Sequence, residues 1–502
     1  MTRALSAALL LIWAAFFISL DFYPDIPPRN DDSYYLTLAK SLSLGRGYDN
    51  LSFPDTRQSL DCFPSGFPLF LMAYWWFIAP HVLFLKLILA GSLIAGVAGS
   101  YRWMRRFLPT MEAGIAAAAF SSAPMFIMLG NSILSETIFI PVLYAGLILT
   151  LKVNENPDDN RNKWYALACM VILARIREVG LAFFALTIIS VLLRREWRKA
   201  AVAVVVVAVW MLWENLSVHA NTGSLNYVSD MATEYGFIND PLKALLILGH
   251  QYIHNLWSFV GSIYANILFP WFYNFAEMNR IKRLVVLGVF LEGSAGAVLL
   301  WKKHGEFRPA IAALLLSWIP VFGMPYTGSL FRHLFPFFPF LVLFFIYPLH
   351  CLAERIKFPA ARYGVLLLLI AIVANQAIWS LQENSFDPFI AQRIEFAEIH
   401  DYIREAGKKP DLLVSPQNFY SYLKTGIPSC FVRENGDLCR YEKYFSGRNV
   451  WGIFDTTRFS LKKNNRCDSL ELKPSGEALI ARGKWRLCRM EKVKYPLDDR
   501  LR

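Results

Sequence analysis

The sequence predicts a polytopic α-helical membrane protein with a small α/β domain at its C-terminal end. Of its 502 residues, 55% are hydrophobic and 18% are charged. A soluble protein of this size could not bury that much apolar surface, and long stretches without charge recur along the chain. The distribution of Lys and Arg predicts the orientation of the helices, and the fall in apolar content after residue 380 predicts the C-terminal domain.

About eleven apolar runs are candidates for membrane-spanning helices, several of them shorter than the roughly 20 residues that a bilayer requires. The first run follows Arg3 and has no small-residue cleavage site before Asp21, so we expect a retained helix that enters from the cytoplasm. The runs are 4–20, 81–101, 112–130, 133–151, 163–176, 179–193, 199–216, 284–301, 309–326, 332–351 and 363–380.

The basic residues predict the orientation of these helices. With a cytoplasmic N-terminus, alternate connections carry Lys and Arg clusters on the cytoplasmic side, as the positive-inside rule requires. The clusters lie at 102–106, 152–163, 194–199, 302–308 and 355–362. Because topology explains most of the net charge of +12, we expect no nucleic-acid partner. A P-loop, a zinc-type Cys/His spacing and a dinucleotide fingerprint are also missing from the sequence.

The same orientation predicts two domains. Residues 1–380 form a transmembrane domain with external loops at 21–80 and 217–281, and residues 381–502 form an extracytoplasmic α/β domain. The pattern of the tail predicts a helix, a strand, a second helix and a closing strand pair. We expect a multi-pass protein of the inner membrane, in contact with membrane lipids.

The tail also contains Cys430, Cys439, Cys467 and Cys488. In an oxidising compartment these cysteines could form disulfides, most simply Cys430–Cys439 and Cys467–Cys488. This is one of the three pairings that four cysteines allow, and reduced thiols are the alternative.

Two adjacent carboxylates, Asp31 and Asp32, follow the first apolar run in PPRNDDSYYLTLAKSLSLGRGY. They begin a short amphipathic helix that Gly45 should end, and its apolar face should lie in the membrane interface. That face is formed by Tyr34, Leu38 and Leu42. Helix capping and the helix dipole explain one carboxylate well and two less well.

The next motif is FPSGFPLFLMAYWWFIAP, residues 63–80. It is aromatic, broken by proline and short for a span, so we expect an interfacial or re-entrant segment that lines a cavity. An external aromatic cavity with two carboxylates at its edge could bind a sugar. Trp and Tyr residues of an ordinary membrane interface are the alternative.

The order and spacing of several motifs resemble the GT-C superfamily of membrane glycosyltransferases, in particular the bacterial branch related to ArnT and the protein O-mannosyltransferases. The resemblance covers nearly the whole chain. It is carried by DDSYYLTLAKSLSLGRGY with FPSGFPLF, SSAPMFIMLGNSILSETIFIPVLYAGLIL, LARIREVGLAF, FRHLFPFFPFLVLFF and, in the tail, DYIREAGKKPDLLVSPQNFYSYLKTG.

This resemblance implies inverting transfer of a sugar from a polyprenyl-phosphate-linked donor to an envelope acceptor, whether a glycan, a lipid or a protein. In that family a carboxylate after the first span is the general base; Asp31 matches it, and Asp32 is its acidic neighbour. A positioned carboxylate can take the proton of an attacking hydroxyl. Glu136 would contact the acceptor or a metal, although a boundary acid can also face water. Asp31, Asp32 and Glu136 could together bind a divalent ion, which some of these enzymes do without.

The leaving group would be a lipid phosphate, so cations should gather at the outer face. Arginine suits a phosphate because its planar fork donates two parallel hydrogen bonds. Lys86 could instead snorkel, the cations near residue 280 could contact headgroups, and His333 could be a packing residue. The candidates are Lys86, Arg175, Arg177, Arg280, Lys282, Arg283, Arg332 and His333.

One departure from the family limits what the resemblance implies. The aminoarabinose-transferring branch has a lysine before the prolines of its first loop, where this chain has CFPSGFPLF, so the donor sugar can differ from aminoarabinose and a lipid A acceptor does not follow from the resemblance. A transporter or flippase for lipid-linked glycans and a non-catalytic assembly protein are the alternatives. Retention of the carboxylates, the placement of intramembrane charges towards one face and the lack of evident inverted repeats favour the enzyme.

Overall fold

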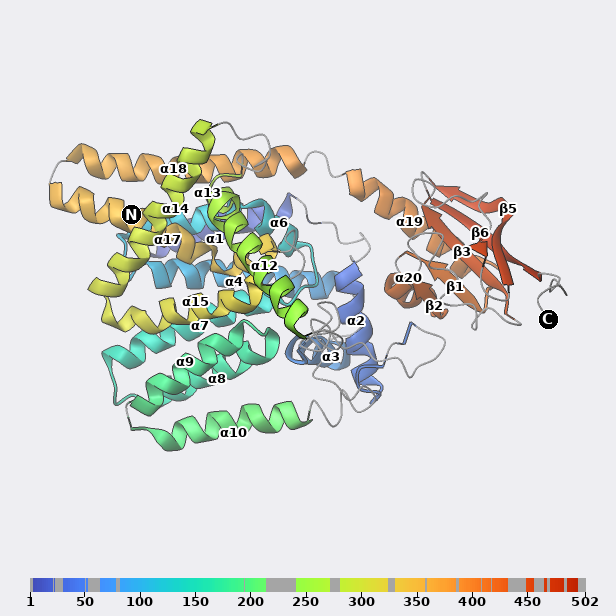
Figure 1. The fold of residues 1–502 in the computed structure, drawn as a ribbon, viewed down its shortest axis with the longest axis horizontal. Helices are drawn as coiled ribbons and strands as arrows, with labels where there is room; N and C mark the ends of the chain where they lie inside the picture. Colours follow the sequence, from blue (N-terminus) through green and yellow to red (C-terminus); the bar gives the residue numbers. More distant parts are fainter. Residues whose placement is uncertain are drawn as a thin grey trace.

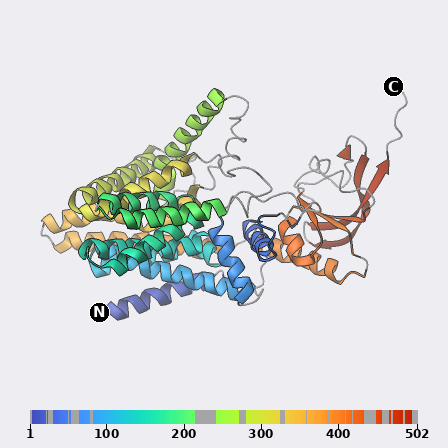
Figure 2. The same ribbon diagram turned by 90° about the horizontal axis from the view of Figure 1, so that it is seen from below.

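The computed structural model describes the chain apart from residues 1–2, 21, 23–29, 50, 53–63, 78–81, 194, 214–240, 271–279, 324–329, 357–358, 385–387, 408, 417, 432–447, 456–464, 467–469, 483–484 and 495–502. A helical bundle forms most of the protein, and a sheet domain lies at the C-terminal end (Figure 1). Two short helices, α2 and α3, lie at the end of the bundle that faces the sheet domain in both views (Figure 2). This arrangement confirms the predicted fold class.

The first part of the bundle follows the predicted runs closely. Its helices are α1 (Arg3–Ser19), α2 (Asn30–Ser43), α3 (Gly66–Phe77), α4 (Val82–Met104), α5 (Thr110–Ser122), α6 (Pro124–Gly130), α7 (Glu136–Glu155), α8 (Asn160–Ile176), α9 (Gly180–Leu193) and α10 (Trp197–Trp213). The run predicted at 112–130 is interrupted at Ala123, where α5 and α6 meet at 62°. Proline at the first position of α6 is compatible with a helix start but not with continuation of α5.

The second part contains helical elements within residues 217–281, which the sequence predicts to be an external loop. These are α12 (Pro241–Ser258), a π-helical turn η2 (Phe259–Ile263) and α13 (Tyr264–Leu268). Asn255 Nδ2 donates to the Phe322 carbonyl at 2.8 Å, and Tyr264 Oη donates to the Leu341 carbonyl at 3.1 Å. Both bonds are buried, so this segment belongs to the bundle.

The bundle continues with α14 (Arg280–Lys303), η5 (Gly305–Phe307), α15 (Arg308–Phe322), α16 (Leu330–Leu334), η7 (Phe335–Phe337), α17 (Phe338–Ile356) and α18 (Pro359–Asn384). Proline lacks the amide donor that a continuous α-helix requires, and the FPFFPF motif accordingly forms the 3₁₀ turn η7 between α16 and α17. Tyr144 Oη donates to the Pro336 carbonyl at 3.0 Å and ties this turn to α7.

Six helices in the described part of the chain are long and apolar enough to cross a membrane, or seven if α5 and α6 count as one span. Three shorter apolar helices lie at Leu5–Ser19, Gly66–Phe77 and Gly180–Leu193. These findings fit a multi-pass protein, and the count near eleven stays a prediction.

The C-terminal domain has the predicted order of elements. It consists of α19 (Pro388–Glu405), β1 (Leu412–Ser415), α20 (Asn418–Thr425), β2 (Ser429–Phe431), β3 (Val450–Asp455), β4 (Asn465–Arg466), β5 (Leu470–Arg482) and β6 (Trp485–Lys494). The sheet order is β2-β1-β3-β6-β5-β4, with β1 parallel to β2 and β3 and the other pairs antiparallel. The closing pair is β5 and β6, as the sequence predicts.

The orientation of α2 differs from the sequence-based expectation. Its apolar residues Tyr34, Leu38 and Leu42 pack with Leu69 and Met72 of α3, so this face is covered by protein instead of lying on the bilayer. The predicted stop is correct, since Gly45 adopts φ +70° directly after the helix.

The far side of α2 meets the C-terminal domain. Lys40 Nζ lies 4.7 Å from the centre of the Tyr422 ring on α20. The Ser429 amide donates to the Ser52 carbonyl at 2.5 Å. The helix that carries Asp31 is thus held between the bundle and the sheet domain.

Candidate active site

Acidic and basic side chains from distant parts of the sequence meet at the end of the bundle near α2. Glu136 Oε1 lies 2.5 Å from Arg177 Nη1 and 2.6 Å from Arg332 Nε. Arg332 Nη1 lies 2.5 Å from Asp31 Oδ2. We call Asp31, Glu136, Arg177 and Arg332 the acid–arginine cluster. Its members come from α2, the start of α7, the turn after α8 and α16.

Close packing of backbones holds the turn that carries Arg177. Arg177 leaves α8 in an extended conformation, with φ −150° and ψ 146°. A Cβ added to Gly180 would lie 2.1 Å from the Leu173 carbonyl oxygen, and one added to Gly66 would lie 2.4 Å from the Arg175 carbonyl oxygen. Glycine at these positions therefore lets α9 and α3 approach the end of α8.

Exposure falls from Asp31 towards the interior of the cluster. The side chain of Asp31 is 48% exposed, that of Arg332 22%, that of Arg177 8% and that of Glu136 0%. A buried carboxylate is costly unless it is paired, and the two guanidinium groups supply the pairing for Glu136. Asp31 is the acid of the cluster that a substrate can reach, whereas its neighbour Asp32 is buried.

A tyrosine and a serine extend the cluster and were not singled out as site residues from the sequence. Ser135 Oγ lies 3.3 Å from Glu136 Oε2, and Tyr35 Oη lies 3.4 Å from Ser135 Oγ. Burial, with a further contribution from the Glu136 charge, raises the pKa of Tyr35 above its usual range, so Tyr35 stays protonated. Its position four residues after Asp31 in a helix was the signal that could have identified it.

No protein-family model matches the sequence, and a search of curated protein sequences gives no match. Solved structures, however, are similar in fold. ArnT from Cupriavidus metallidurans in the apo state is 12% identical, with a TM-score of 0.53 and 97% of both chains covered. The archaeal oligosaccharyltransferase AglB from Archaeoglobus fulgidus, in complex with an inhibitory peptide and a dolichol-phosphate, is 13% identical, with a TM-score of 0.54, 90% of this chain and 70% of that chain covered.

The chain has the GT-C fold. A second ArnT structure, bound to undecaprenyl phosphate, matches with a TM-score of 0.50 at 14% identity over 97% of each chain. The predicted resemblance is confirmed at the level of fold. Because one fold can host unrelated activities, the activity has to be argued from the residues of the site.

Lys86 is buried inside the helical bundle, whereas His333 is half-buried. Lys86 is 1% exposed, and its Nζ donates to Asn131 Oδ1 at 3.0 Å, so the snorkelling alternative is wrong. His333 Nδ1 contacts Arg177 Nη2. This contact places His333 beside the acid–arginine cluster.

Arg175, Lys282 and Arg283 lie outside the cluster. Arg175 is buried, with its guanidinium 5.7 Å from the centre of the Trp210 ring. Lys282 and Arg283 are exposed at the start of α14, and the side chain of Arg280 lies outside the described residues. A role of these cations in donor binding stays a prediction.

The acid–arginine cluster fits a divalent metal ion poorly. Glu136 Oε1 already contacts both guanidinium groups, and Asp31 Oδ2 is paired with Arg332. To bind the ion, these carboxylates would have to give up their contacts with the two guanidinium groups. Within the described residues, no group of three or more His, Cys, Asp or Glu side chains is placed to hold a metal.

The predicted disulfides lie largely outside the described residues. Cys430 in β2 and Cys488 in β6 are buried, and neither forms a disulfide with another cysteine of the described residues. Burial raises the pKa of Cys430 to about 12. Because Cys439 and Cys467 are not among the described residues, the pairing stays a prediction.

Proposed function

We propose that this chain is a glycosyltransferase that transfers a sugar from a polyprenyl-phosphate-linked donor to an envelope acceptor at the extracytoplasmic face of the inner membrane. The observation that carries the proposal is the ion pair between Asp31 and Arg332, which holds an accessible carboxylate beside an arginine at one end of a GT-C bundle. ArnT bound to undecaprenyl phosphate and AglB bound to a dolichol-phosphate share this fold.

Asp31 is suited to act as the general base. Its pair with Arg332 fixes one carboxylate oxygen, while 48% of the side chain stays exposed to an acceptor. As the acceptor hydroxyl attacks the anomeric carbon, its proton passes to Asp31 and the bond from that carbon to the phosphate oxygen breaks. The configuration at the anomeric carbon inverts, and the polyprenyl phosphate leaves with the bonding electrons.

Arg332 would act on both the general base Asp31 and the departing phosphate. Its Nε and Nη1 hold Glu136 and Asp31, so the guanidinium is fixed in position before a substrate arrives. A fixed guanidinium next to the reacting carbon can stabilise the charge that develops on the departing phosphate. Arg177, on the other side of Glu136, can extend the same positive field.

We assign Glu136 a positioning role. It is 0% exposed and contacts both guanidinium groups, which leaves it enclosed by Arg177 and Arg332. Direct contact with an acceptor would require those ion pairs to open. The buried charge of Glu136 therefore orients the arginines that act on the donor.

The position of the cluster favours an enzyme over a transporter. Glu136 is the first residue of α7, a helix of 20 residues that is apolar enough to span the membrane. Transporter folds place their binding sites near the middle of the bilayer, often at broken helices. A cluster at the end of a span suits chemistry at the membrane surface.

The proposal can be tested by screening radiolabelled polyprenyl-phosphate sugars with purified protein and envelope extracts. We expect label to move from one donor to an extract component with wild-type protein and not with Asp31→Asn. Transfer by both proteins, or by neither with any donor while both remain folded, would contradict the proposal.

A further inference from the structure

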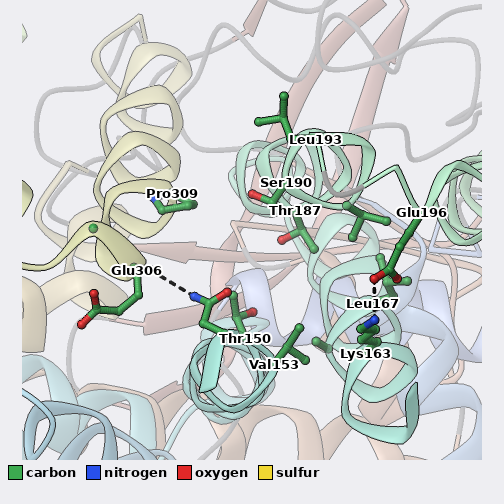
Figure 3. A pocket seen from close by; sticks show the side chains of 14 residues that line it. Thr150, Val153, Lys163, Leu167, Thr187, Ser190, Leu193, Glu196, Glu306 and Pro309 are labelled. Carbon is green, nitrogen blue, oxygen red and sulfur yellow. Dashed lines mark hydrogen bonds and ion pairs between the residues drawn. The ribbon is translucent and has the colours of Figure 1, made fainter. Parts of the chain in front are cut away.

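A cavity of about 390 Å³ lies at the end of the bundle opposite the acid–arginine cluster. It is lined by the C-terminal part of α7, the start of α8, the end of α9 and the segment from η5 into α15 (Figure 3). Thr150 lines it and lies fourteen residues after Glu136 on α7, which corresponds to roughly 21 Å along the helix axis. The cavity is therefore separate from the site described above.

The hydroxyl groups in the wall of the cavity are already hydrogen-bonded. Thr150, Thr187 and Ser190 donate to the carbonyl oxygens of Gly146, Phe183 and Leu186, four residues before each of them, at 2.9, 2.8 and 2.9 Å. These hydroxyl protons are thus used within their own helices. A sugar or another polar ligand would find few free hydrogen-bond donors here, whereas an alkyl chain forms no hydrogen bonds and does not need them.

Apolar residues complete the wall and reach the surface. Val153, Leu167 and Val191 line the cavity together with Leu193. Leu193 is 80% exposed at the rim. Because the outer surface of α9 is apolar and suited to lipid, a chain from the surrounding bilayer could enter beside Leu193.

On the α8 side of the cavity, Lys163 and Glu196 line the wall, and Lys199 contacts Glu196 without lining the cavity itself. Glu196 is paired with Lys163, and Lys199 Nζ lies 2.8 Å from its second carboxylate oxygen. Lys199 also donates to Asn160 Oδ1 at 2.6 Å. Two ammonium groups on one carboxylate leave a net positive charge here. Glu306, on the other side of the cavity, has an exposed side chain that contacts His304 at 3.3 Å.

We propose that this cavity binds one acyl chain of an anionic phospholipid, with the phosphate of the headgroup against Lys163 and Lys199. The apolar interior suits the chain, and the excess of positive charge suits the phosphate. The site lies at the bundle end that holds the basic clusters, which is the end predicted to meet the cytoplasmic leaflet.

The test uses the full chain, stripped of lipid in detergent, and native mass spectrometry with added lipid. The probes are phosphatidylglycerol, phosphatidylcholine with the same chains, and glycerol phosphate without chains. Wild-type protein should bind phosphatidylglycerol more tightly than phosphatidylcholine and should not bind glycerol phosphate. Equal binding of the two lipids, or binding of glycerol phosphate alone, would overturn the proposal.

Two variants and their controls test the chain and the headgroup separately. Thr187→Trp fills the cavity and should weaken phosphatidylglycerol binding by about tenfold or more, which corresponds to roughly 1.4 kcal/mol. Lys163→Gln leaves Lys199 and Glu196 as a neutral pair and should remove the preference for phosphatidylglycerol. Ile189→Trp on the exposed face of α9 and Arg161→Gln on the exposed surface of α8 should behave like wild type.

Direct labelling covers the case in which Thr187→Trp does not fold. Phosphatidylglycerol with a diazirine in one acyl chain should label α7, α8 and α9 peptides that line the cavity in wild-type protein. Labelling confined to the outer surfaces of the bundle, or wild-type binding by a folded Thr187→Trp, would exclude the cavity as the lipid site.

Discussion

At the scale of single residues, Glu136 determines the geometry of the candidate site. Its carboxylate is buried and joins Arg177 to Arg332, and Arg332 in turn holds Asp31. Removing one partner of a buried ion pair leaves the other charges without compensation. Asp31 depends indirectly on Glu136, although the two residues lie in different helices.

We expect Glu136→Gln to lower the free energy of unfolding by about 3 kcal/mol and to reduce activity, because two guanidinium groups would remain near an uncharged amide. The matched control is Glu155→Gln at the other end of α7. Glu155 pairs with Arg106 at the surface, with a side chain 54% exposed, so its loss should cost less than about 1 kcal/mol. Thermal unfolding in detergent measures both variants, and equal shifts would show that Glu136 is not a critical buried charge.

At the scale of elements, close backbone contacts position the arginines. Gly66 in the FPSGFPLF motif begins α3 and lies against the end of α8, directly before Arg177. The motif was recognisable in the sequence, but its partner was not. A glycine required for close approach shows only in the folded chain.

Gly66→Ala should therefore disturb the site through packing. Its new Cβ would meet the Arg175 carbonyl oxygen at 2.4 Å, so the backbone must shift, with a loss of about 1–3 kcal/mol and a fall in activity. Gly91→Ala in α4 is the control, because a Cβ at that position meets nothing within 4 Å among the described atoms. That variant should be neutral or slightly stabilising. A Gly66→Ala protein as stable and active as Gly91→Ala would show that the close approach is not needed.

The C-terminal domain should respond to pH through His400. This side chain is 1% exposed, with Nδ1 2.7 Å from the Phe396 carbonyl and Nε2 2.8 Å from Ser421 Oγ. Burial lowers the pKa of His400 to about 4, compared with about 6.5 in an unfolded chain. Below pH 6.5 the unfolded chain therefore binds the proton more readily than the folded one.

It follows that the stabilisation associated with neutral His400 is complete above about pH 6.5 and is lost as the pH falls towards 4, by up to about 3 kcal/mol. We expect the melting temperature of wild type to fall more between pH 7 and pH 4.5 than that of His400→Gln. Parallel pH profiles for the two proteins would show that His400 does not titrate in this way.

Much of the element order could be predicted from the sequence because it depends on local patterns. Apolar runs indicated the bundle helices, and alternating apolar residues with turn signals indicated the strands of the tail. The partner of the apolar face of α2 could not be predicted, since Tyr34 and Leu38 suit a bilayer as well as they suit α3. The cluster itself joins residues 31 and 332, and no local sequence pattern indicates a contact between residues so far apart in the chain.

At the scale of the whole molecule, the proposed function requires the cluster to lie on the external side of the membrane. In both ribbon views the sheet domain lies beyond the end of the bundle that carries α2 and α3 (Figures 1 and 2). The C-terminal domain and Asp31 should thus share one side, and the basic connections predict that this side is external.

A reporter fused after Arg502 tests this topology. An enzyme reporter that requires the external compartment should be active, and one that requires the cytoplasm should be inactive. The opposite pattern would place the acid–arginine cluster in the cytoplasm. A lipid-linked donor at the external face would then be excluded for this site.

The most direct test of the central claim is the turnover of Asp31→Asn with the donor that wild type uses. The amide retains the size of the side chain, and Arg332 keeps its contact with Glu136, so loss of this partly exposed ion pair should change stability by less than about 1 kcal/mol. An amide cannot accept the acceptor proton, so we expect activity to fall at least about a hundredfold. Asp32→Asn should be less impaired, because Asp32 is buried and does not belong to the cluster. A folded Asp31→Asn protein with wild-type turnover would show that Asp31 is not the base.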